Sequence, residues 1–163
     1  MGDGVGEMTM VTWQIGSAAS ACWIEHQILE HVKQALRVTL EWKAPAVSLP
    51  HKMSSVAFTL KSFQRHLERL MAIEEEGGYM TLVSEAHPHL QQRIDYLAHD
   101  HERFRRQICD IVPYVEELCE WQPVEFAEVC AEIFLLLDEV DSHDEQEISL
   151  LQDSLLLDDG GEG

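Results

Sequence analysis

The chain has 163 residues, 45% of them hydrophobic, so it is long enough and apolar enough to bury one core. Its 30 acidic and 11 basic residues give a net charge of −19, and a surface this negative repels nucleic-acid phosphates and anionic membrane faces. No apolar run approaches the roughly 20 residues that a bilayer-spanning helix needs, so we expect a protein that binds neither nucleic acid nor membrane.

The first half of the chain predicts a leader and two helices. Residues 1–16 are rich in glycine and polar residues and predict a flexible leader. A first helix is predicted over about residues 17–43, where apolar side chains recur at helical spacing. Ser48 and Pro50 suit the N-cap and first turn of a second helix, over about residues 51–76, and Gly77 and Gly78 end it.

The second half predicts two more helices. After a short turn or partial helix at residues 79–86, Pro88 begins a helix that extends to about residue 120, with a kink or break near Asp110 because Pro113 lies inside it. Pro123 begins the last helix, to about residue 157, and residues 158–163 form an acidic, glycine-rich tail. Short connections favour antiparallel neighbours, so residues 17–157 predict an all-α, up-down-up-down four-helix bundle.

Histidine and glutamate interrupt the apolar stripes of all four predicted helices. A buried imidazole or carboxylate is costly unless it is paired or coordinates a metal. In an antiparallel bundle these positions fall in the same half of the molecule, and their mixed nitrogen and oxygen donors suit iron, manganese or zinc better than calcium. For each one alone, a hydrogen-bonded core residue remains the alternative. The candidate metal ligands are His26, Glu74, His101, His143 and Glu147.

Two other features narrow the class of protein. Ferritin-like di-iron bundles use Glu-x-x-His on two helices, and none of the nine histidines has Glu or Asp three residues before it, so that class is disfavoured. The four cysteines form no Cys-x-x-Cys pair and lie in helix-like segments. This pattern favours buried free thiols and a reducing, cytoplasmic compartment.

The interrupting residues and their neighbours resemble a hemerythrin-like (HHE cation-binding) domain over residues 20–162. The resemblance implies a hemerythrin-like bundle that binds iron, commonly as a non-haem di-iron centre that binds O₂ or responds to oxygen, redox state or iron level. It implies the same five candidate ligands, with the carboxylates bridging or capping the metals. Its carriers are Ile24-Glu25-His26, Glu74-Glu75-Glu76-Gly77-Gly78-Tyr79, Asp100-His101-Glu102, and His143-Asp144-Glu145-Gln146-Glu147.

The chain departs from the family pattern in the second helix. The family's His-x-x-x-Glu would place a histidine four residues before Glu74, and this chain has Leu70 there. An apolar residue at that position weakens one metal subsite, which favours a sensor over an oxygen carrier. It also leaves open a metal-free, degenerate bundle that acts as a protein-interaction or scaffold module. The chain offers no nucleophile–base constellation or phosphate-binding glycine loop, so an enzyme is the least favoured interpretation.

Overall fold

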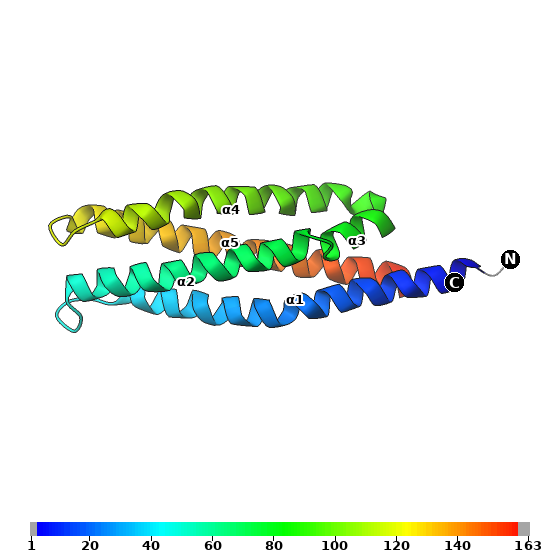
Figure 1. Cartoon of the computed structure of the whole chain (residues 1–163), viewed down its shortest axis with the longest axis horizontal. Coiled ribbons are helices and arrows are strands. Elements are labelled where there is room, and N and C mark those ends of the chain that lie inside the picture. Colours follow the sequence, from blue (N-terminus) through cyan, green and yellow to red (C-terminus); the bar gives the residue numbers. More distant parts are fainter. Residues whose placement is uncertain (1–2, 160–163) are drawn as a thin grey trace.

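The computed structural model describes residues 3–159, and in this range it is all-helical. The four longest helices lie side by side along the long axis of the molecule (Figure 1). The α1–α2 and α4–α5 connections lie at one end, and α3 lies at the other (Figure 1). None of the described helices is long and apolar enough to cross a membrane. The elements are α1 (Asp3–Glu41), α2 (Leu49–Glu75), α3 (Tyr79–Ala86), the 3₁₀ helix η1 (Pro88–Leu90), α4 (Gln91–Glu117) and α5 (Pro123–Asp159).

The apolar stripes read from the sequence meet in one core between the long helices. The expectation of an all-α protein built on four long helices is therefore confirmed. Side chains three and four residues apart share a helix face, so each helix turns one stripe inward and leaves its charged residues in solvent. Fully buried members from each long helix include Leu29, Leu36, Leu60, Phe63, Phe104, Ile108, Ile133 and Leu137.

The ends of α2 are set by the residues expected to set them. Ser48 is the N-cap, and its hydroxyl oxygen accepts a hydrogen bond from the His51 backbone N–H at 3.4 Å. At the other end, Gly77 has φ +71°, a conformation that favours glycine. A side chain at Gly78 would collide with the carbonyl oxygens of Ile73 and Glu74. Because only glycine allows this close approach, the chain doubles back tightly against the last turn of α2.

The helix boundaries differ from the prediction at the start of the chain. Residues 3–16 belong to α1, where a flexible leader was expected. Ile15 is fully buried in the core, and its packing extends the helix toward the N-terminus beyond the boundary that composition suggested. Met1 and Gly2 of that predicted leader lie outside the described residues. Likewise, α5 continues to Asp159, and the remaining four residues of the predicted tail lie outside the described range.

Pro113 does not end α4, which continues to Glu117. Proline has no N–H to donate to the carbonyl four residues earlier, which here belongs to Cys109. Cys109 is exposed, so water can satisfy the freed carbonyl and the helix tolerates the proline. Pro88 begins η1, and α4 follows directly from it at Gln91.

The cysteines divide into two pairs. Cys22 and Cys130 are buried free thiols, as expected. The expectation is wrong for Cys109 and Cys119, which are exposed. Cys109 lies within α4 outside its apolar stripe, and Cys119 lies in the connection between α4 and α5.

Lys33 occupies a core position in the stripe of α1, and ion pairs with α5 explain its burial. Its ammonium nitrogen lies 2.6 Å from Asp141 Oδ1 and 2.9 Å from Asp144 Oδ2. A third carboxylate, Glu30 one turn earlier on α1, lies 3.0 Å away. A buried ammonium requires such partners, so these contacts fix the register between α1 and α5 two turns from His26.

Candidate metal centre

The five predicted ligands, one or two from each long helix, come together in the core. Each falls in an inward-facing stripe, which is why five residues far apart in sequence converge. His101 is 0% exposed, and Glu74 and Glu147 are 1% exposed. His143 is buried, and His26 is half-buried at the edge of the cluster. Their donor atoms form two overlapping groups that share Glu74.

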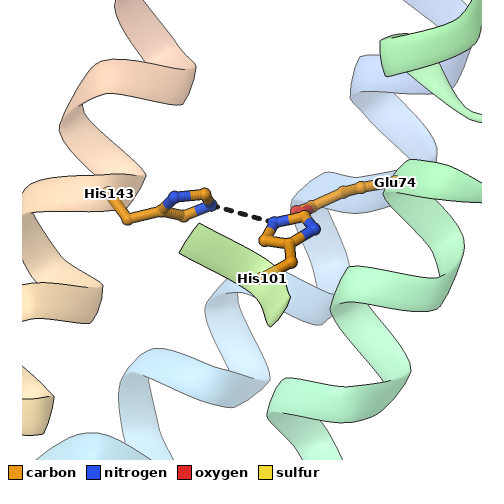
Figure 2. Close-up of side chains that lie close together, drawn as sticks. All are labelled: Glu74, His101 and His143. Carbon is orange, nitrogen blue, oxygen red and sulfur yellow. Dashed lines mark hydrogen bonds and ion pairs between the residues drawn. The ribbon is translucent and has the colours of Figure 1, made fainter. Parts of the chain in front are cut away.

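The first group joins α2, α4 and α5. His101 Nε2 lies 3.0 Å from His143 Nε2 and 3.3 Å from Glu74 Oε2. Figure 2 shows the His101 ring between the other two side chains, with the His143 ring turned toward it. Two nitrogen donors and one carboxylate oxygen therefore face one small volume between three helices.

The second group joins α1, α2 and α5. His26 Nε2 lies 3.2 Å from Glu74 Oε1 and 3.2 Å from Glu147 Oε2. The two oxygens of the Glu74 carboxylate thus contact different groups, because Oε2 is the oxygen near His101. Glu74 stands between the two groups as a shared member.

The His101 nitrogen that points away from the cluster, Nδ1, is bonded to a carboxylate that an arginine holds in place. His101 Nδ1–H donates to Glu75 Oε1 at 2.6 Å. Arg105 in turn donates to both oxygens of Glu75, at 3.1 and 2.8 Å. Burial would raise the pKa of Glu75, but the bonds from Arg105 and His101 outweigh it and lower the pKa, so Glu75 is an acceptor only. The Nδ1 proton leaves Nε2 free to face the cluster.

His143 has a similar arrangement. Its Nδ1–H donates to Asp100 Oδ2 at 3.3 Å, and Arg103 donates to Asp100 Oδ1 at 2.9 Å. An imidazole whose outer N–H is held by a carboxylate is the usual orientation of a metal-ligating histidine. Glu75 and Asp100 were not predicted from the sequence as functional residues. Each is an acidic residue directly beside a candidate ligand, and that adjacency was the available signal.

Without a metal, His101 and His143 can share a proton in a hydrogen bond between their Nε2 atoms. Burial would lower the pKa of His101, but Glu74 and Glu75 outweigh it and raise the pKa. Burial, together with the charge of His101, lowers the pKa of His143. An imidazolium at His101 can therefore donate to a neutral His143. This proton-bonded pair is the metal-free counterpart of the site.

Several polar atoms in the cluster have no hydrogen bond, which tests whether a cation fits. Neither oxygen of Glu147 and only one of the two oxygens of Glu74 has one, although His26 lies close to both residues. Burial raises the pKa of Glu147, even though His26 lies close to it. Donor atoms on a metal at about 2.1 Å are separated by about 3.0–3.4 Å, which matches the contacts seen here. The residues therefore fit a metal ion.

Leu70 contributes no donor to either group. It is buried one turn before Glu74, in the stripe that faces the core. His66, one turn earlier again, also belongs to neither group, so it does not replace the missing imidazole. The centre as described has three imidazoles and two carboxylates from the five predicted residues.

The charge of His26 predicts a pH dependence for metal-stripped protein. Burial would lower its pKa, but Glu147 and Glu74 outweigh it and raise the pKa to about 10. Since this folded-state pKa exceeds the unfolded value of about 6.5, the stabilisation is complete below pH 6.5 and is lost as pH rises through 10. The free energy of unfolding should fall by about 1 kcal/mol per pH unit between these limits.

Urea unfolding from pH 6 to 10 in the presence of a chelator measures this slope. The variant His26→Gln should lose most of it, whereas His31→Gln, at an exposed position of the same helix, should keep it. A slope in His26→Gln equal to that of the wild type would contradict the assignment.

Comparisons with known proteins leave the centre to be judged on its geometry. No family model, curated protein or solved structure matches this chain. The geometry itself shows buried histidine and glutamate groups at distances that could hold a metal ion.

Proposed function

We propose that this protein is a hemerythrin-like, up-down-up-down bundle that holds non-haem iron at a two-metal centre and senses oxygen, redox state or iron level. The metal ligands in this proposal are His26, Glu74, His101, His143 and Glu147. The proposal is supported by the convergence of these five residues from four helices and by the fit of their spacing to a metal ion.

One observation carries the proposal. His101 Nε2 and His143 Nε2 face each other at 3.0 Å, while each outer nitrogen is bonded to a carboxylate. Both inner nitrogens then present lone pairs to the same buried point, where Glu74 adds negative charge. A cation at this point satisfies all three donors at once.

The protein residues have three tasks at this centre. Glu74 divides its two oxygens between the groups, as a bridging carboxylate does. Glu75 and Asp100 orient the imidazoles, and burial excludes bulk water. Bound iron would supply a one-electron redox couple and a Lewis-acidic position. Zinc or manganese suits the same donors, and metal analysis distinguishes them.

A sensing role is supported by the partial exposure of the outer carboxylates. The Glu75 side chain is 31% exposed, and it links the buried His101 to Arg105 near the surface. Asp100 links His143 to Arg103 and lines a surface cleft of about 420 Å³ between α4 and α5. A change in charge at the buried centre would alter these ion pairs, which a partner protein can contact.

Metal analysis of protein purified without added metal tests the proposal. We expect about two equivalents of iron per chain and an oxo-bridged di-iron absorption band in the oxidised protein. His101→Gln should lose most of the iron, and His99→Gln, exposed on the same helix, should retain it. Less than about a tenth of an equivalent of iron, manganese or zinc in the wild type would refute the proposal.

The alternative is a metal-free bundle that serves as an interaction or scaffold module. It is favoured by the buried Leu70 and by the ability of a proton to join His101 and His143. Leu70→His separates the two cases, because it restores an imidazole one turn from Glu74. An iron content raised by this change would indicate a metal site, and no metal in either protein would favour the scaffold.

A further inference from the structure

Tyr79 is a buried phenol for which the proposed centre has no role so far. It is the first residue of α3 and is 0% exposed. Its hydroxyl is buried close to the Glu147 carboxylate but makes no well-formed hydrogen bond. A phenylalanine would fill the same space without burying a polar atom, so packing alone does not account for the hydroxyl.

The turn before α3 explains how Tyr79 reaches the centre. Gly78 packs against the carbonyl oxygens of Ile73 and Glu74, so the chain reverses within a few residues of a metal ligand. The next side chain, Tyr79, then enters the core. Burial raises the pKa of this phenol, and the nearby carboxylates of Glu147 and Glu74 raise it further.

The two groups of the centre each have three donors, but of different kinds, and Tyr79 lies beside the group with fewer imidazoles. His101 and His143 give the first group two imidazoles, whereas the second has only His26. Leu70 supplies nothing to either group. The group with one imidazole therefore also holds the Glu147 oxygens and lies beside the Tyr79 hydroxyl, and none of these oxygens makes a well-formed hydrogen bond.

We infer that Tyr79 Oη is a further metal ligand of the His26 subsite and that its phenolate oxygen supplies the donor that Leu70 cannot. This inference rests on the proposed function. On binding, the phenol proton is released to solvent and no electron is transferred, as is usual when a protein ligand exchanges a proton for a metal ion. A hard, anionic oxygen beside two carboxylates makes this subsite selective for iron(III) over softer divalent ions.

The test uses full-length protein loaded with iron(III). A phenolate ligand produces a visible phenolate-to-iron charge-transfer band, and excitation in that band enhances phenolate ring modes in the resonance Raman spectrum. We expect both signals in the wild type and neither in Tyr79→Phe. Iron affinity in chelator competition should fall about tenfold or more in Tyr79→Phe.

The other two tyrosines provide matched controls. Tyr96 and Tyr114 are exposed, so Tyr96→Phe and Tyr114→Phe should keep both signals. Cys22→Ser should also keep them, since Cys22 is buried near the same carboxylates but belongs to neither donor group. Metal-free Tyr79→Phe should remain folded, because phenylalanine fills the same buried space.

Iron content measured on the same samples separates failure of this inference from failure of the proposed function. Wild type that binds iron without a phenolate band, or a band that survives in Tyr79→Phe, would overturn the role of Tyr79 and leave the metal centre intact. Wild type that binds no iron would overturn both.

Discussion

Glu74→Gln is expected to empty both metal subsites at once. Glu74 contacts His26 through one carboxylate oxygen and His101 through the other, so its loss removes a donor and a negative charge from each group. Glutamine has nearly the same shape, so the side-chain volume in the core is preserved. Since loss of even an outer-shell partner typically costs 10–100-fold in metal affinity, loss of this shared ligand should cost at least about 100-fold.

Iron content per chain measures the effect, with circular dichroism as a check that the variant is folded. Glu74→Gln should retain less than about a tenth of the wild-type iron. His26→Gln, which touches only one group, should retain about half. Glu76→Gln is the matched control, because Glu76 is exposed two residues away. Retention of about half the iron by Glu74→Gln would show that Glu74 serves one subsite only.

Removal of metal is expected to lower the melting temperature substantially. A ligand present at a thousandfold excess over its dissociation constant stabilises the folded state by about 4 kcal/mol. For a chain of this size, each kcal/mol shifts the melting temperature by about 2–4 °C, so a chelator should lower it by roughly 8–16 °C for each site emptied. Thermal unfolding with and without chelator, followed by readdition of iron, measures the loss and its recovery.

The variant Glu74→Gln provides the control for this effect. Its melting temperature should be insensitive to the chelator, since little metal remains to be removed. In His143→Gln, the part of the chelator effect that comes from the His101 group should be missing, so the chelator should lower the melting temperature less than in the wild type. If the wild type melts at the same temperature with and without chelator, the stability of the bundle does not depend on metal and the scaffold interpretation gains support.

The amino-acid sequence alone was enough to predict four long helices and the five residues that converge between them. Helical periodicity places His101 and Glu147 on inward faces, and the alternation of antiparallel helices places them at one height. Neither inference requires knowledge of side-chain conformations. Their convergence in the structure confirms the geometric part of the prediction, whereas metal binding itself remains a proposal.

Other features of the centre and of the fold could not be predicted from the sequence, because they depend on tertiary contacts. Glu75 and its partners His101 and Arg105 lie on different helices, and so do Asp100 and His143, so these contacts form only when the helices pack. Tyr79 becomes a core residue only because of the tight turn at Gly78. At the start of α1, burial of Ile15 outweighs a glycine-rich composition, which local propensity cannot reveal.

The carboxylate shared by the two groups belongs to the last turn of α2, next to the glycine turn that leads into α3. Local opening at this end of α2 would withdraw one donor from each group while the other long helices stay packed. The exchange of a bound ion would therefore be controlled by this one turn and would not require the bundle to unfold. A centre that exchanges in this way would follow changes in the metal supply.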